Sequence, residues 1–157
     1  TAAGSFPRLV DLNINPKVIA SAINISIAQR LLRKLCPYCK KEEPLQGDQK
    51  KLIETIIQSI QDKSYLENLQ MGVAWQSVGC DKCNKTGYKG RIGIFEAILI
   101  DESVENIIQE NPSEREIKKA TAHQGLLDMK QDGIIKVLKG VTSISELERV
   151  IDLGERV

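Results

Sequence analysis

Aromatic residues and histidine are scarce in this sequence. Phe, Trp and Tyr make up 4% of the 157 residues, and there is one histidine, His123. Lys and Arg total 22 against 21 Asp and Glu, so the formal net charge is +1. Nucleic-acid-binding domains usually carry a basic excess concentrated on one surface. The composition therefore argues against a dedicated nucleic-acid binder, and no nucleic acid is expected among the partners.

Long apolar runs are also missing. No stretch reaches the roughly 18 apolar residues of a membrane-spanning helix, so no direct membrane span is expected. With 41% apolar and 27% charged residues, the composition is that of a folded protein of one or two small domains. The chain opens on Thr1 rather than on methionine, which favours a piece of a longer protein.

Motifs of catalytic chemistry are absent as well. The sequence contains neither the G-x-x-x-x-G-K-[ST] phosphate-binding loop nor the H-E-x-x-H motif of metalloproteases. His123 lies in a polar stretch that is typical of a surface residue. We therefore expect no catalytic residue within this chain.

Four cysteines form two Cys-x-x-Cys pairs, Cys36 with Cys39 and Cys80 with Cys83. Each pair can form a tight turn whose backbone amides point at the sulfurs, and Gly87 adds flexibility after the second pair. Two such pairs favour a structural Zn²⁺ held by four thiolates, a closed tetrahedral site with no open position. Its net charge of −2 would be offset by basic residues at positions 33, 34, 40, 41, 82, 85 and 89.

Disulfides and a redox pair are the alternatives at these cysteines. Disulfides are rare in chains that stay in a reducing compartment. A redox pair needs an accessible thiol of low pKa beside a βαβ unit, and the pattern predicts no such unit around Cys36 or Cys80. The metal site is therefore the favoured interpretation.

Hydrophobic periodicity predicts a mixture of helices and strands. The pattern indicates short helices at 6–12 and from Asn15-Pro16 onward, a strand over 23–35, a loop at 40–48, a helix at 52–60 and a strand at 91–100. The second strand has apolar residues on both faces, which predicts a sheet covered on two sides. Glu96 interrupts this strand, so it is either paired structurally or placed near a site.

Short helices fill the rest of the sequence. Capping-box patterns begin helices at Ser113-x-x-Glu116 and at Ser143-x-x-Glu146, and residues 101–152 are expected to form a bundle of about four helices. The two strands bracket the cysteine-bearing insert, so the simplest topology puts them in one sheet with the metal unit at its edge. Because two strands make a poor sheet, further strands are expected outside this chain.

Several segments resemble the cytoplasmic ATPases that power type II secretion and type IV pilus assembly. The similar segments are 6–12, 19–22, the run 27–39 with its first cysteine pair, 79–83, 86–96, 129–133 and 140–143. The resemblance implies an α/β fold, as the C-terminal fragment of a RecA-like P-loop ATPase domain. It further implies a core remnant at 1–35 and 90–100, an inserted zinc-binding subdomain at 36–89 and a C-terminal helical bundle at 101–157.

The same resemblance implies a function for the full-length protein. It would be a hexameric motor that couples ATP hydrolysis, with ATP and Mg²⁺ bound, to pilus or pseudopilus assembly or to protein secretion. The expected partners are the other subunits of a homohexamer, an inner-membrane platform and cytoplasmic docking proteins, with the motor in the cytoplasm at the inner membrane. The chain taken alone is expected to be inactive, and the tetracysteine motif favours assembly or export over retraction.

Two arginines are candidate nucleotide contacts by this resemblance. Arg91 looks like a basic residue that the family places near the bound nucleotide, and Arg30 follows the same logic. An arginine can meet a phosphate or an adenine face. The alternatives are a salt bridge of Arg91 with Glu96 or another carboxylate, and solvent exposure of Arg30. A stand-alone zinc-ribbon adaptor that binds protein or nucleic acid remains the alternative for the whole chain.

Overall fold

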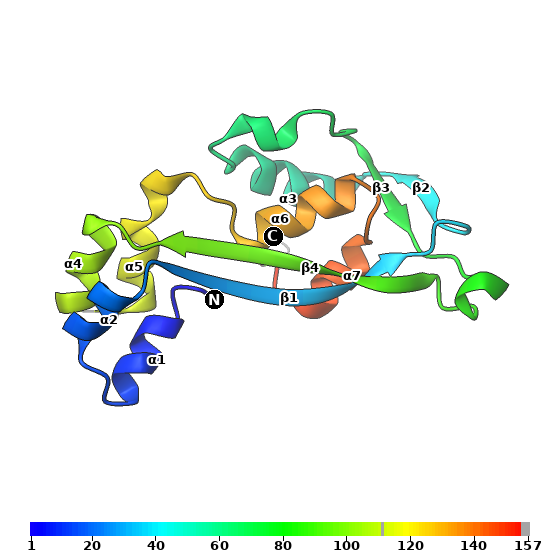
Figure 1. Cartoon of the computed structure of the whole chain (residues 1–157). Helices are drawn as coiled ribbons and strands as arrows, with labels where there is room; N and C mark the ends of the chain where they lie inside the picture. The colour runs from blue at the N-terminus through cyan, green and yellow to red at the C-terminus, as the bar shows by residue number, and fades with distance from the viewer. Residues whose placement is uncertain (111, 155–157) are drawn as a thin grey trace. The chain divides into compact units, whose positions relative to one another are not determined.

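The computed structural model describes residues 1–110 and 112–154 and has a mixed α/β fold (Figure 1). In chain order the elements are α1 (Ser5–Asp11), α2 (Pro16–Ala22), β1 (Ile25–Leu35), β2 (Lys41–Pro44), α3 (Gly47–Gln58), η1 (Lys63–Leu66), β3 (Val73–Gln76), η2 (Asp81–Cys83), β4 (Tyr88–Leu99), α4 (Glu102–Glu110), α5 (Glu114–Ala120), η3 (Ala122–Gln124), α6 (Met129–Leu138) and α7 (Ile144–Val150). None of the described helices has the length and apolarity needed to cross a membrane.

The chain forms two compact units. The first contains Thr1–Ala28 and Phe95–Leu126, and the second contains Gln29–Ile94 and Leu127–Val157. This division cuts across the three expected subdomains, because the helices after residue 101 are shared between the units. The assignment of a core remnant, a zinc-binding insert and a helical subdomain therefore concerns the full-length protein and stays a prediction.

In the first unit, helices α1, α2, α4 and α5 enclose a small core. Helix α2 begins as its sequence predicts, with Pro16 in the first turn and the Asn15 side chain accepting a hydrogen bond from the Lys17 backbone N–H. Helices α2 and α4 pack against each other. The core consists mainly of aliphatic side chains around Phe6, which is fully buried.

Strands β1 and β4 are neighbours in a two-stranded sheet, as predicted for the strands that bracket the cysteines (Figure 1). In the first unit, the Ile100 N–H donates to the Asn24 carbonyl at 2.9 Å. In the second unit, the Cys36 N–H donates to the Gly87 carbonyl at 2.9 Å. The end of β1 is therefore opposite the start of β4, which is the antiparallel arrangement.

One face of this sheet is open, contrary to the prediction of a sheet covered on both sides. In the first unit Ile98 is buried, whereas Ile27 and Phe95 are 59% and 46% exposed. Within the described part of the chain, the helices of this unit cover the face of Ile98, whereas Ile25 of β1 and Leu99 of β4 are about half exposed. A strand with apolar residues on both faces was therefore correctly identified, but its second face is not buried in this chain.

In the second unit a second sheet corrects another prediction. Residues 40–48 were expected to be a loop, but β2 pairs antiparallel with β3, with Lys41 opposite Gln76 and Pro44 opposite Val73. All four residues of β2 are exposed, so no alternating apolar pattern marks the strand. Pro44, which has no N–H to donate, lies at the end of the strand, where a proline is tolerated.

Helices α3, α6 and α7 pack with this small sheet around the larger core. Helix α6 contacts α3, α7 and β3. Leu32, Ile94, Ile134 and Leu147 are fully buried at the centre. Helix α6 begins with a capping box between Asp128 and Gln131, which the sequence analysis did not identify.

The expected capping boxes at residues 113 and 143 are only half formed. Ser113 and Ser143 cap their helices by accepting hydrogen bonds from the N–H groups of Glu116 and Glu146. The Glu146 carboxylate does not return to the backbone of Ser143. It accepts hydrogen bonds from Arg33, through the backbone N–H at 2.9 Å and the guanidinium at 2.6 and 2.9 Å, and from Arg149 at 2.8 and 2.9 Å.

This arrangement makes Glu146 a buried anion held between two cations. Its side chain is fully buried, whereas those of Arg33 and Arg149 are about half exposed. Burial by itself would raise the pKa of the Glu146 carboxyl, but the bonds from Arg149 and Arg33 outweigh it and lower the pKa to about 2. The ionised carboxylate therefore joins α7 to the end of β1.

Replacing Glu146 with glutamine is expected to destabilise the fold by about 2–3 kcal/mol at pH 7, because the stability that accompanies the lowered pKa of the carboxyl is lost when the arginines lose their counter-ion. The stability that the carboxylate contributes is fully present above its ordinary pKa of about 4.3 and is lost as the pH falls toward about 2. Urea unfolding should therefore show a gap between wild type and Glu146→Gln that narrows below about pH 4. The exposed Glu43→Gln variant should match wild type throughout, and an equal loss in both variants contradicts the assignment.

Candidate metal centre

Two turns bring the four cysteines together. The turn with Cys36 and Cys39 lies between β1 and β2, and the turn with Cys80 and Cys83 lies between β3 and β4, where η2 forms (Figure 1). The four sulfur atoms all lie within 4.8 Å of one another, and Cys36 and Cys83 are buried. The predicted juxtaposition of cysteines 44 residues apart is therefore confirmed.

The sulfur distances fit a tetrahedral metal site. Sγ atoms are separated by 3.9 Å between Cys36 and Cys80, and by 3.8 Å both between Cys39 and Cys83 and between Cys80 and Cys83. A tetrahedron with metal–sulfur bonds of about 2.3 Å has edges of about 3.8 Å. All four thiols are free, at distances far beyond the roughly 2.05 Å of a disulfide bond. The donor set and its spacing therefore suit a tetrathiolate-bound ion such as Zn²⁺.

Backbone N–H groups point at the sulfurs, as the turn pattern predicted. Cys83 Sγ accepts from the N–H groups of Cys80 and Gly87 at 3.2 Å, and Cys39 Sγ accepts from Gly79 at 3.3 Å. Burial would raise the pKa of the Cys83 thiol, but the two N–H donors and the neighbouring cysteines lower it overall. The N–H donors around Cys83 thus favour its thiolate, which is the form that binds a metal. At Cys39, by contrast, burial outweighs the Gly79 N–H and raises the pKa of the thiol to about 11.

Gly87 is required by this geometry. Its φ of +76° lies in the left-handed region, and a Cβ at this position would come within 2.5 Å of the Ser77 Cβ. A side chain would therefore move the N–H that donates to Cys83. The flexible glycine noted after the second cysteine pair has this specific role.

The basic residues expected to offset the charge of the site are largely engaged elsewhere. Lys85 pairs with Asp81 at 2.6 Å, and Arg33 pairs with Glu146. The ammonium groups of Lys82 and Lys40 lie over aromatic rings, at 3.8 Å from the ring centre of Tyr38 and 4.3 Å from that of Trp75. The charge of a bound tetrathiolate would therefore be balanced mainly by N–H dipoles and nearby, already paired cations.

The two candidate nucleotide contacts are exposed and lie apart from one another in the second unit. Among the described residues, neither Arg91 nor Arg30 forms a recorded ion pair or hydrogen bond through its side chain. Alternation along the strands puts Arg30 on the face of the buried Leu32, and Arg91 on the face opposite Ile92 and Ile94. The two guanidinium groups therefore do not form a single phosphate-binding site in this chain. Glu96, the third residue in question, accepts a hydrogen bond from the Ala2 backbone N–H.

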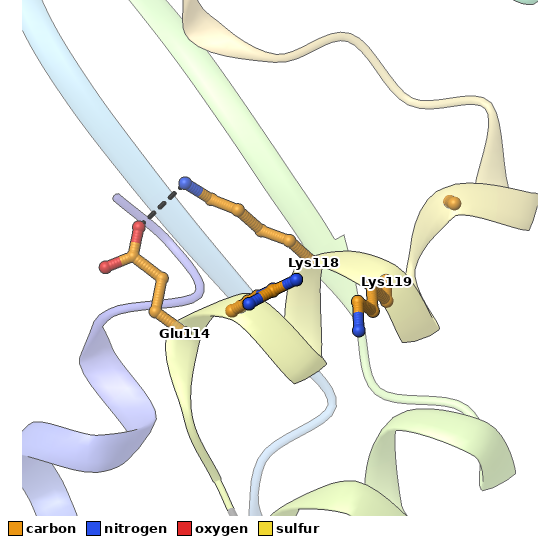
Figure 2. A pocket seen from close by; sticks show the side chains of 5 residues that line it. Glu114, Lys118 and Lys119 are labelled. Atoms are coloured by element: carbon orange, nitrogen blue, oxygen red, sulfur yellow. Dashed lines mark ion pairs between the residues drawn. The ribbon is translucent and has the colours of Figure 1, made fainter.

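A surface hollow on α5 offers no better site. Its lining comes from one short helix and the residue that starts η3: Glu114, Arg115, Lys118, Lys119 and Ala122. Figure 2 shows the ion pair between Lys118 and Glu114, whose charged atoms are 2.7 Å apart, and Lys119 pairs with Glu116 at 3.1 Å. Both lysines already have a carboxylate partner, so the positive charge left in the hollow is that of Arg115.

Sequence reasoning missed the surroundings of the first cysteine pair. Lys40 donates to the Gly140 carbonyl at 2.8 Å and packs over Trp75, while the Tyr88 hydroxyl lies 2.7 Å from the Ser143 hydroxyl. These residues are far apart in the sequence, and no spacing rule connects them. The adjacency of Lys40 to Cys39 was the only available signal.

Comparisons with known proteins identify the family of this chain. The chain is 36% identical to type II secretion system protein E of Aeromonas hydrophila and 36% identical to type II secretion system ATPase E of Vibrio cholerae, and it is 33% identical to type IV pilus assembly ATPase PilB of Pseudomonas aeruginosa. Each match includes 96% of this chain but only 25–28% of the relative, so the chain spans about a quarter of their length. The model of the type II/IV secretion system protein family matches residues 1–149, and the chain therefore belongs to this family.

Proposed function

We propose that this chain is the C-terminal part of a motor ATPase that drives pilus or pseudopilus assembly or type II protein secretion. The observation that carries the proposal is the family match over residues 1–149, together with relatives named as secretion and pilus assembly ATPases. A match of this extent favours the motor over a stand-alone zinc-ribbon adaptor. The full-length protein would bind ATP and Mg²⁺ and form a homohexamer with a RecA-like core.

The proposed partners and location follow from the same relationship. The motor would act in the cytoplasm at the inner membrane, against a membrane platform and cytoplasmic docking proteins. The exposed apolar side chains of β1 and β4 in the first unit, such as Ile27 and Leu99, are suited to packing against a further layer of such a core. The relatives are assembly and secretion proteins, which supports assembly or export over retraction.

The four cysteines are proposed to hold one structural Zn²⁺. A site closed by four thiolates leaves no position for water or substrate, so the ion would supply folding free energy rather than catalysis. Such sites contribute roughly 10–16 kcal/mol in small peptides, which is ample to close the segment between the two cysteine pairs. The N–H groups of Gly79, Cys80 and Gly87 would orient and stabilise the thiolates.

Elemental analysis of the purified chain is expected to find one zinc per molecule. Cys80→Ser should remove the metal and make residues 36–90 the first to be cleaved by protease, while α4 and α5 in the other unit stay protected. Asp81→Asn changes an exposed neighbour of the ligands and should keep the zinc. A metal-free chain, or one in which alkylation after unfolding with a chelator detects no free thiols, contradicts the zinc assignment.

The chain by itself is expected neither to bind ATP tightly nor to hydrolyse it. Motors of this class hold the phosphates with P-loop amides and a P-loop lysine, and this sequence contains no such loop. Arg91 alone can supply one charge-assisted contact, which is insufficient for micromolar affinity. Titration calorimetry should detect no binding at micromolar ATP, and a sub-micromolar dissociation constant contradicts the assignment.

The motor function is tested in the full-length protein through Arg91. If Arg91 contacts the nucleotide, Arg91→Ala should lower kcat/KM for ATP by about 10–100-fold, since it removes one charge-assisted hydrogen bond. Lys89→Ala is the matched control, because Lys89 is exposed on the same face of β4. An equal effect of both variants removes the specific role of Arg91, and a full-length protein without any ATPase activity removes the motor function itself.

A further inference from the structure

The turn between α6 and α7 is bonded to the residues on both sides of the first cysteine pair. The Leu35 N–H, one residue before Cys36, donates to the Val141 carbonyl at 2.9 Å. The Lys40 ammonium, one residue after Cys39, donates to the Gly140 carbonyl at 2.8 Å. Both ends of the cysteine turn are therefore attached to two consecutive carbonyls of one distant turn.

Trp75 forms the other side of this junction. The Lys40 ammonium lies 4.3 Å from the centre of the indole ring. Gly140 packs against the same ring so closely that a Cβ would come within 2.7 Å of the indole Nε1, and its φ is +65°. Because β3, which carries Trp75, leads toward the second cysteine pair, the junction involves the residue before β2 and one residue of β3.

The α6–α7 turn also determines where α7 begins. Gly140 is buried and Thr142 Oγ1 donates to the Arg33 carbonyl at 2.9 Å. Ser143 caps α7 and contacts the hydroxyl of Tyr88, on whose ring the Arg33 guanidinium stacks at 4.2 Å. A shift of residues 140–142 would therefore be transmitted to the start of α7 and to the Glu146 ion pairs.

We propose that metal occupancy of the four-cysteine site sets the conformation of the α6–α7 turn, with Lys40 as the positioning residue and Trp75 as part of the contact. The inference rests on the proposed zinc site. With the ion bound, residues 36–39 are held at four sulfur positions, and Lys40 is presented to Trp75 and Gly140. Without the ion, no metal–sulfur bond joins the two cysteine pairs, and the Lys40 contacts are released.

The coupling works in both directions, because a conformational free energy shared by two sites is reciprocal. A partner that holds the α6–α7 turn in its present form would strengthen metal binding, and one that distorts the turn would weaken it. The metal site therefore has two structural effects: it closes the insert in which it lies, and it fixes the start of α7.

Hydrogen exchange and the fluorescence of Trp75, the one tryptophan of the chain, test this proposal. Removing zinc with a chelator should raise the exchange rates of residues 139–143 by about tenfold or more and shift the tryptophan emission to the red. Adding zinc back should restore both signals. Exchange in α4, which belongs to the other unit, serves as the internal reference.

The variant Lys40→Met separates the coupling from zinc binding itself. It should still hold one zinc per chain, yet its loaded form should show the fast exchange at 139–143 of the stripped wild type. Lys41→Met is the matched control, because Lys41 is exposed on β2 and has no recorded side-chain partner among the described residues. It should behave as wild type does.

Two results would overturn the coupling. One is hydrogen exchange at residues 139–143 of zinc-loaded Lys40→Met that is as slow as in the zinc-loaded wild type. The other is a stripped wild type whose turn stays fully protected. If stripping unfolds the whole second unit, the loaded Lys40→Met variant still decides the question. A wild-type chain that binds no zinc contradicts the metal assignment, and the stoichiometry measurement identifies that outcome separately.

Discussion

The convergence of four cysteine sulfurs within 4.8 Å is the constraint on which the second unit depends. It closes the segment from Cys36, directly after β1, to Cys83, shortly before β4, and loop closure of this kind is unfavourable unless something offsets its entropy. Within the closed segment, the exposed, polar strand β2 pairs with the more apolar strand β3. Their pairing puts Trp75 beside Lys40, and the α6–α7 turn then closes over both.

Electrostatics holds the other side of this unit. Glu146 is 1% exposed and accepts bonds from two arginines, so the helix that carries it is attached to β1 by charge as well as by packing. A buried ion pair of this kind adds little net stability compared with a well-packed apolar contact, but it permits few alternative arrangements. Because the buried Glu146 carboxylate cannot be left unpaired, its ion pairs define where α7 packs on β1.

The first unit has a different character. Its core is a small aliphatic cluster around Phe6, and its share of the β1–β4 sheet has one covered and one open face. Relatives of which this chain spans about a quarter are named as secretion and pilus assembly proteins. A part of a layered ATPase core would need one apolar face for each neighbouring layer. The proposed function therefore assigns the open face of the first unit to contact with a further layer.

Local patterns in the sequence were sufficient for part of this structure. Proline at 16, the alternating residues of β1 and β4, and the serine caps at 113 and 143 act over a few residues, so their helices and strands were predicted correctly. The cysteine spacing likewise predicted a four-sulfur cluster, because the chemistry of the thiolates allows few other arrangements.

Apart from the cysteine cluster and the pairing of β1 with β4, contacts between distant segments were decided by the tertiary structure. β2 is a strand only because β3 lies beside it, and the Glu146 carboxylate leaves its expected capping box because Arg33 is within reach. The second face of β4 is a further example. Its burial depends on whether another layer packs against it, and the residues of the strand do not determine that. Local propensities involve neighbours in the chain, whereas burial and ion pairing depend on which residues the fold brings together, and no spacing in the sequence encodes that.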